Sequence, residues 1–187
     1  MEESSDKDQE RKKVYEVITV PVSLEENQEN IIVTANNLYQ PSKKEIINQA
    51  IQFHLKGNIP EATKYYQLFI KQGVKDYRIF SNYGVILKNL GKLKEAEISY
   101  RKAIELKPDF TDAYLNLGNI LRDLGKLQEA EISYRKAIEI NPDFAIAHYN
   151  LGIILKNLGK LQEAELSYYK AIEIKPDYAE AHLNLGN

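Results

Sequence analysis

The same pattern of 34 residues recurs along this chain without a gap. Residues 77–110, 111–144 and 145–178 each carry one glycine early, a second glycine near the middle, and a Pro-Asp pair close to the end. A more divergent unit precedes them at residues 43–76, and a partial unit occupies residues 179–187. A fixed period of this length indicates one supersecondary unit stacked on copies of itself, because a single unit cannot bury its own apolar face.

Each unit has the pattern of two amphipathic helices. In the third unit, apolar residues recur at helical spacing over residues 111–124, Gly125 ends that stretch, and a second stretch runs from about 128 to 140. Asp143, which follows Pro142, is placed to cap the next helix with its carboxylate. The pattern therefore predicts an all-α solenoid of antiparallel helix pairs.

Small residues recur where the two helices of a unit should touch. A glycine stands midway along each first helix, at a cost of roughly 1 kcal/mol relative to alanine, so close packing must offset it. An alanine of the second helix is expected to face each glycine, with a tyrosine filling the space beside them. The glycines are Gly84, Gly118 and Gly152, the alanines are Ala96, Ala130 and Ala164, and the tyrosines are Tyr100, Tyr134 and Tyr168.

These positions carry a resemblance to a known family. The set Tyr114, Leu117-Gly118, Leu121, Gly125, Ala130, Tyr134, Ala137 and Pro142 resembles the tetratricopeptide repeat, and the likeness covers residues 43–187. The first unit departs from it, with Ala50 in place of the midhelix glycine and Phe69 in place of a later alanine. The resemblance implies a right-handed superhelix whose first helices line a concave groove.

The leader, residues 1–42, has a different character. Residues 1–13 mix charges of both signs, which favours a solvated chain. Two short apolar pieces follow at residues 14–24 and 31–34. Pairing of these pieces as strands is one alternative, but an isolated two-stranded hairpin has little stability in water. An extended or disordered leader is therefore favoured.

The strongest candidate for a functional site is a column of asparagines. The sixth residue of every unit is asparagine, at Asn48, Asn82, Asn116, Asn150 and Asn184. This place lies opposite the alanine seam, so we expect it to face the groove, where carboxamides can hold a peptide main chain as donors and acceptors. The arrangement resembles the asparagine array in the superhelical repeat arms of O-linked N-acetylglucosamine transferases. The alternative is that these asparagines serve the scaffold alone.

Charged and polar residues flank this column. Cations recur near the ends of the first helices at Lys88, Arg122 and Lys156, and they are followed by Asn89, Asp123 and Asn157. Together they favour a protein or peptide partner that is acidic or that ends in a C-terminal carboxylate. Chaperone-binding members of the family use Lys, Arg and Asn in this way, but another clamp position here holds Ile47, Ser81, Leu115 and Tyr149, which argues against a dedicated chaperone clamp. Solvated surface charge is the alternative for each lysine.

Composition and motifs exclude several function classes. The chain has no cysteine and a net charge of −2, so thiolate chemistry is excluded, and no basic field attracts nucleic acid or an anionic membrane. His148 and His182 lie one period apart on the packing face, without metal-ligand spacing. Glu97 and Glu131 stand four residues before arginines, which fits exposed ion pairs rather than catalytic carboxylates. We expect a cytoplasmic protein without cofactor, metal, membrane span or catalytic site.

The final unit leaves two interpretations of the whole chain. Either the array is a fragment of a longer one, which we favour, or its open end stacks against another molecule and produces end-to-end self-association. The sequence accordingly predicts a scaffold that binds an extended peptide in the concave groove. The alternative is a substrate-recruiting repeat arm of a longer glycosyl- or sulfo-transferase truncated at Asn187. A smaller third option is that the leader itself occupies the groove.

Overall fold

The computed structural model describes residues 17–20, 31–34 and 42–185 of the chain. It divides into two units, Met1–Ile46 and Ile47–Asn187, which are described separately below. The prediction that the leader occupies a groove depends on residues that lie largely outside the described ones. So do the last two residues of the partial fifth unit, Gly186 and Asn187.

Two strands of the leader pair with each other. Strand β1 (Val17–Val20) runs antiparallel to β2 (Ile31–Thr34), with Val17 opposite Thr34 and Val20 opposite Ile31. An extended leader was the favoured prediction, but these two segments adopt the alternative, a hairpin. Their β-branched residues favour pleated backbone, and pairing satisfies N–H and C=O groups that an extended chain leaves to water.

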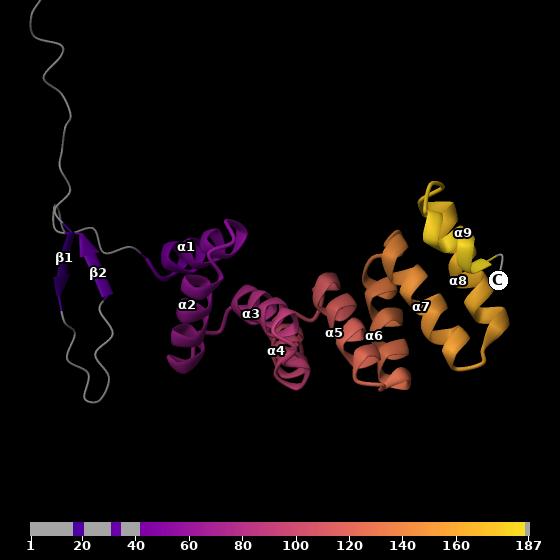
Figure 1. The fold of residues 1–187 in the computed structure, drawn as a ribbon, viewed down its shortest axis with the longest axis horizontal. Helices are drawn as coiled ribbons and strands as arrows, with labels where there is room; N and C mark the ends of the chain where they lie inside the picture. Colours follow the sequence, from indigo (N-terminus) through magenta and orange to yellow (C-terminus); the bar gives the residue numbers. More distant parts are fainter. Residues whose placement is uncertain (1–16, 21–30, 35–41, 186–187) are drawn as a thin grey trace, which may run out of the picture. The chain divides into compact units, whose positions relative to one another are not determined.

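The repeats fold into consecutive helix pairs, which follow one another in chain order (Figure 1). The helices are α1 (Lys43–Leu55), α2 (Ile59–Lys71), α3 (Tyr77–Asn89), α4 (Leu93–Leu106), α5 (Thr111–Asp123), α6 (Leu127–Ile140), α7 (Ala145–Asn157), α8 (Leu161–Ile174) and α9 (Ala179–Leu185). From α3 to α8 the bounds repeat with the 34-residue period. The predicted all-α solenoid is confirmed.

A glycine with positive φ joins the two helices of each pair. Gly125 has a φ of 75°, and its N–H bonds to the carbonyl of Arg122 at 2.9 Å. The N–H of Lys126 returns to the carbonyl of Leu121 at 2.8 Å. Because only glycine adopts this φ without strain, α5 ends here and the chain reverses at once into α6.

The predicted cap by Asp143 is wrong. The N-cap of α7 is Phe144, and no side chain caps that helix end. The N–H of Phe144 bonds to the carbonyl of Asn141 at 3.2 Å, which closes a turn over the Pro-Asp pair. The carboxylate therefore stands one residue before the cap position. An aspartate does cap α3, where Asp76 accepts from the N–H of Arg78 at 2.9 Å.

A tyrosine ring lies over the glycine of each regular pair. A Cβ placed on Gly118 would lie 2.5 Å from Cε1 of Tyr134, and one on Gly152 would lie equally close to Tyr168. The alanines of the second helices, Ala96, Ala130 and Ala164, are buried. The atoms nearest to each glycine nevertheless belong to the tyrosine and not to the alanine that was expected to face it. The glycines thus provide the space for the rings, and this contact fixes how closely the helices of a pair approach.

Candidate functional site

The asparagine column follows the first helices of the array. Each member is the sixth residue of its unit, so the column passes through α1, α3, α5, α7 and α9. Asn48 is exposed, Asn82, Asn116 and Asn184 are half-buried, and Asn150 is buried with 7% of its surface exposed. The members are chemically identical, yet their surroundings differ from helix to helix.

Asn150 is held by a chain of side chains that begins in the core. Its Nδ2 donates to Oδ1 of Asn119 at 3.2 Å, and the same Oδ1 accepts from the hydroxyl of Tyr134 at 2.8 Å. Tyr134 is fully buried, and burial raises the pKa of its hydroxyl, which keeps it a neutral donor. The orientation of the Asn150 carboxamide is therefore set from inside the protein.

The outer members of the column are also engaged by the scaffold. Nδ2 of Asn184 donates to the hydroxyl of Tyr149 at 3.2 Å and to the carbonyl of Glu180 at 2.9 Å. Oδ1 of Asn48 accepts from Nη1 of Arg78 at 3.0 Å. Within the described part of the chain, the carboxamide of Asn116 makes no hydrogen bond.

Asn119 was missed by the sequence analysis. It stands at the ninth place of its unit, where the neighbouring units have Val85 and Ile153. In those units the buried hydroxyls of Tyr100 and Tyr168 have no hydrogen-bond partner among the described residues. The sequence did contain a signal, because Asn119 is polar at a place that is aliphatic in the neighbouring units. Its hydrogen-bond partner Tyr134 lies fifteen positions later in the sequence.

The cations beside the column are paired unequally. The guanidinium of Arg122 bonds to Asp123 at 3.0 Å. Lys88 and Lys156 make no ion pair within the described residues. Both lie in the last turn of their helices, α3 and α7, where a positive charge also stabilises the helix dipole. Their flanking residues Asn89 and Asn157 are exposed.

On the second helices α4, α6 and α8, by contrast, the cations are paired with the exception of Lys94, which makes no ion pair within the described residues. Lys102, Lys136 and Lys170 bond to glutamates three residues ahead at 2.7–3.0 Å. Glu97 accepts from Arg101 within α4 and from Lys126 of the next unit, both at 2.9 Å. The network has an equivalent around Glu131 one period later.

Two of these glutamates are less exposed than the sequence suggested. The side chains of Glu97 and Glu131 are each 12% exposed, because the next unit covers them. Burial opposes the charge of Glu97, but hydrogen bonds from Lys126 and Arg101 outweigh it, so the pKa of Glu97 lies below its ordinary value. The pKa of Glu131 is lowered in the same way by Lys160 and Arg135, against burial.

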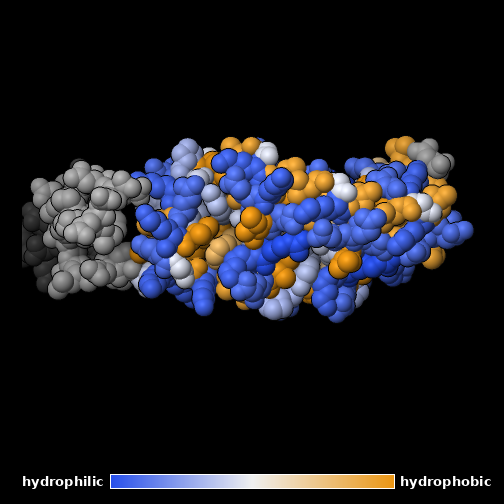
Figure 2. All heavy atoms as spheres, turned by 90° about the horizontal axis from the view of Figure 1, so that it is seen from below, coloured by the Kyte–Doolittle hydropathy of each residue, from blue (hydrophilic) through white to orange (hydrophobic). Residues whose placement is uncertain are grey.

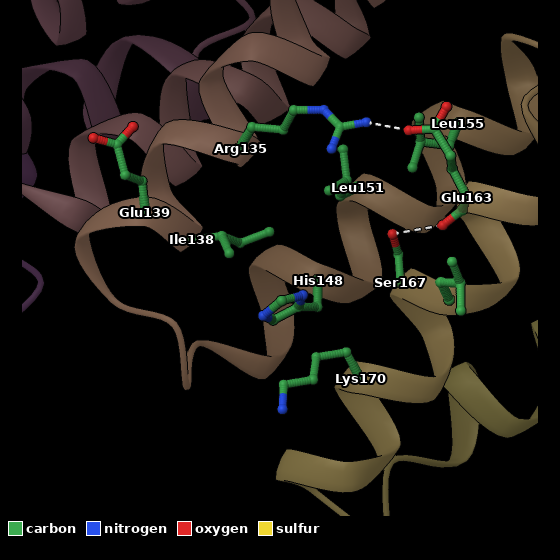
Figure 3. Close-up of a pocket in the computed structure, with 10 residues that line it drawn as sticks. Arg135, Ile138, Glu139, His148, Leu151, Leu155, Glu163, Ser167 and Lys170 are labelled. Carbon is green, nitrogen blue, oxygen red and sulfur yellow. Dashed lines mark hydrogen bonds and ion pairs between the residues drawn. The ribbon is translucent and has the colours of Figure 1, made fainter.

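Two hollows lie between successive second helices. The one between α6 and α8 has a volume of about 500 Å³ and is floored by His148, Leu151 and Leu155 of α7. Figure 3 shows the guanidinium of Arg135 reaching across one end of it to the carboxylate of Glu163, a distance of 2.5 Å. The hollow between α4 and α6 is about 670 Å³ and is lined mostly by the equivalent residues one period earlier, with Arg135 and Glu139 in addition.

Two of the three histidines, His148 and His182, contact the turns that precede their helices. Nε2 of His148 lies 2.8 Å from the carbonyl oxygen of Pro142, and Nε2 of His182 lies 2.9 Å from that of Pro176. Each ring thereby holds the turn that precedes its helix. Among the described residues, no three His, Cys, Asp or Glu side chains gather as metal ligands would. None of the described helices has the length and apolar character needed to span a bilayer.

The helix pairs and the side chains along them define a protein built from helical repeats, of the class that mediates protein–protein interaction. The family model for the TPR repeat matches residues 84–121 and 118–159, and the model for the tetratricopeptide repeat matches residues 145–178. Together the matches span just over half of the chain. The chain therefore belongs to the tetratricopeptide repeat family, as its signature residues predicted.

Solved structures of this family resemble the chain closely in fold. MamA is 26% identical with a TM-score of 0.69, over 73% of this chain and 80% of its own. YrrB, described as a TPR protein with an unusual peptide-binding site, is 25% identical with a TM-score of 0.69, over 76% and 74%. The first TPR of Spaghetti (RPAP3), bound to the HSP90 peptide SRMEEVD, is 25% identical with a TM-score of 0.58, over 59% and 87%. No curated protein matches.

Proposed function

We propose that this array is a scaffold that binds an extended peptide along its first helices, with the asparagine column holding the peptide main chain. One observation carries the proposal: the same carboxamide recurs at the same place of five first helices, α1, α3, α5, α7 and α9. Regularly spaced groups that both donate and accept suit the repeating amides of an extended chain. YrrB and the RPAP3 module, which resemble this chain, are described with a peptide-binding site and a bound peptide.

The hydrogen bonds between the asparagines and the rest of the protein determine which side-chain atom of each asparagine is available to a peptide. Asn150 and Asn184 use Nδ2 on the scaffold, so each offers Oδ1 as an acceptor for a peptide N–H. Asn48 uses Oδ1, so it offers Nδ2 as a donor to a peptide carbonyl. Asn116 offers both groups. An orientation fixed before binding costs less entropy on association than one that must be selected.

The charges beside the column favour an acidic peptide. Lys88 and Lys156 have no carboxylate partner among the described residues, whereas Lys136 and Lys170, which line the two hollows between the second helices, are paired. A peptide carboxylate can therefore pair with either ammonium without first displacing a partner. The peptide in the RPAP3 complex, SRMEEVD, is acidic. Whether internal or C-terminal carboxylates are preferred is decided by comparing amidated and free-acid peptides.

Simultaneous replacement of Asn82, Asn116 and Asn150 by alanine tests this proposal. The probe is an acidic peptide selected on the wild-type protein from a random display library, and affinity is measured by calorimetry. Loss of three hydrogen bonds of about 0.5–1.5 kcal/mol each predicts roughly a 10- to 1,000-fold weaker affinity. The control is Gln128→Ala with Gln162→Ala on the second helices, which should bind like the wild type. An affinity within twofold of the wild type for the triple variant, at unchanged helicity, contradicts the proposal.

The alternative function is that of a substrate-recruiting arm of a larger transferase. It rests on the incomplete fifth unit, which a fragment of a longer array would show, and on the use of such repeat arrays as arms of sugar- or sulfate-transferring enzymes. The reading frame beyond Asn187 decides it, since this alternative requires a catalytic domain there.

A further inference from the structure

Helix α7 differs from the other first helices in the side chains that it exposes. Ile146, Tyr149 and Ile153 are three and four residues apart, so they lie along one side of the helix. Ile146 is 40% exposed, and Tyr149 and Ile153 are half-buried. We call these three residues the apolar stripe of α7. Single apolar groups among polar ones, such as Figure 2 shows on one face, are ordinary on a protein surface, whereas apolar residues gathered on one side of a helix indicate a binding site.

The two preceding first helices are more polar at the same places. Helix α5 has Asp112 and Asn119 where α7 has the first and last residues of the stripe. Helix α3 has Arg78 and Val85 there. Because α3 and α5 form the same kind of helix pair with a charged residue at the first place, packing of the repeat does not require the apolar side chain of Ile146.

The stripe lies on the side of α7 that carries the asparagine column. Asn150 comes four residues after Ile146 and three before Ile153, which places all three on one side of the helix. A peptide whose main chain bonds to Asn150 therefore brings its own side chains against the stripe.

A cation without a partner stands at the end of the stripe. Helix α7 has no Asp or Glu, and Lys156 is exposed and makes no ion pair within the described residues. Lys156 follows Ile153 by three residues, which is about 4.5 Å along the helix axis. Residues of an extended peptide are about 3.3 Å apart, so a carboxylate one or two residues from an apolar side chain can reach this ammonium group.

Helix α9 adds a further apolar side chain beside the stripe. Nδ2 of Asn184 donates to the hydroxyl of Tyr149 at 3.2 Å, so this part of α9 lies next to α7. Leu183, the equivalent of Tyr149 one unit later, is 67% exposed. The apolar surface therefore continues from α7 to α9, whereas the equivalent of Ile146 on α5 is the exposed Asp112.

We propose that the apolar stripe of α7 determines the specificity of the peptide site, and that it selects peptides with an aliphatic or aromatic residue close to an acidic one. This inference rests on the proposed function, because the asparagine column must hold the peptide for its side chain to meet the stripe. Contact with Ile146 and Ile153 removes apolar surface of both partners from water, and the neighbouring carboxylate pairs with Lys156. A purely acidic peptide leaves the stripe in water and binds more weakly.

Parallel selections from one random display library test this specificity. One selection uses the wild type, and the other uses Ile146→Gln/Ile153→Gln, since glutamine has a good helix propensity. Wild-type binders should be enriched in peptides with an aliphatic or aromatic residue near Asp or Glu, and binders of the variant should keep the acidic residues but lose the apolar enrichment. Ile98→Gln/Ile132→Gln is the matched control, because these isoleucines of α4 and α6 are 69% and 68% exposed, and it should select the same peptides as the wild type.

Calorimetry gives the second measurement, with the peptide most enriched on the wild type and the same peptide after serine replaces its apolar residue. The wild type should bind the serine peptide about 10- to 100-fold more weakly, because the apolar contact is lost. Ile146→Gln/Ile153→Gln should bind the two peptides within about threefold of each other. Ile146→Gln alone changes a side chain that is already partly exposed, so it should keep the circular dichroism of the wild type and reduce the discrimination in part.

The possible results distinguish this inference from the proposed function. Equal discrimination by the wild type and Ile146→Gln/Ile153→Gln, or wild-type binders without apolar enrichment, overturns the inference, even where the alanine variant of Asn82, Asn116 and Asn150 loses affinity and so supports the proposed function. Unchanged affinity of that triple variant overturns both. Sedimentation equilibrium without peptide tests another occupant: self-association of the wild type that is absent in Ile146→Gln/Ile153→Gln would assign the stripe to a second copy and overturn the inference.

Discussion

Replacement of Gly118 by alanine tests how the helix pairs are held together. In an open helix this change stabilises by about 1 kcal/mol, because alanine has the higher helix propensity. Here the new Cβ would lie 2.5 Å from Cε1 of Tyr134, about 0.9 Å short of ordinary van der Waals contact at 3.4 Å. The ring is fully buried and cannot swing into solvent. The two helices or the ring must therefore move.

The magnitude follows from what that movement disrupts. Overpacking a core position costs about 1–3 kcal/mol. A displaced ring also weakens the bond from the Tyr134 hydroxyl to Asn119, at about 1 kcal/mol. Against a propensity gain of about 1 kcal/mol, Gly118→Ala should destabilise the protein by about 1–3 kcal/mol.

Gly84→Ala is the matched control. Its Cβ would lie 2.9 Å from the ring of Tyr100, whose hydroxyl has no hydrogen bond to lose among the described residues. This variant should therefore lose clearly less stability than Gly118→Ala. Urea denaturation followed by far-ultraviolet circular dichroism measures both. A stabilised Gly118→Ala variant, or equal losses at the two sites, would show that the Tyr134 contact does not limit the approach of α5 and α6.

Two further predictions concern charge and the peptide site. Because the folded-state pKa of Glu97 and Glu131 is depressed, the stability they contribute is complete above their ordinary pKa of 4.5 and is lost as pH falls through the lower folded value. The urea midpoint of Glu97→Gln/Glu131→Gln should thus fall less steeply with acidification than that of the wild type, and an identical slope would contradict this. Asn119→Val, which copies the residue of the preceding unit, should weaken peptide binding about 3- to 10-fold, because the carboxamide of Asn150 would lose its hydrogen-bond partner. Calorimetry measures the affinity, and an affinity equal to that of the wild type would show that Asn119 does not position the column.

The features that the sequence predicted well are those that depend on local physics. Helix periods and the positive φ of Gly125 each depend on a few neighbouring residues, and three regular units supply the same signal three times. The prediction that Asp143 caps α7 was wrong because a closed turn before Phe144 moves the start of this helix by one residue. Such a shift lies within the ordinary uncertainty of helix boundaries.

The features that sequence did not reveal depend on contacts between units. The pairing of Glu97 with Arg101 is local and was predicted, but its second partner, Lys126, lies in the next unit and makes the carboxylate buried rather than exposed. The link from Asn119 to Asn150 spans 31 positions. The repeat period identifies equivalent positions in successive units. It does not show which residue of another unit contacts a residue, such as Asn119, that departs from the repeat pattern.

The cations of the first helices and those of the second helices are paired to different extents. On the second helices α4, α6 and α8, the lysines and arginines other than Lys94 are bonded to glutamates of the same or the next unit, which links the units. Along the first helices, Lys88 and Lys156 have no such partner in the described part of the chain. High salt should therefore weaken binding of an acidic peptide, because ions screen the unpaired ammonium groups.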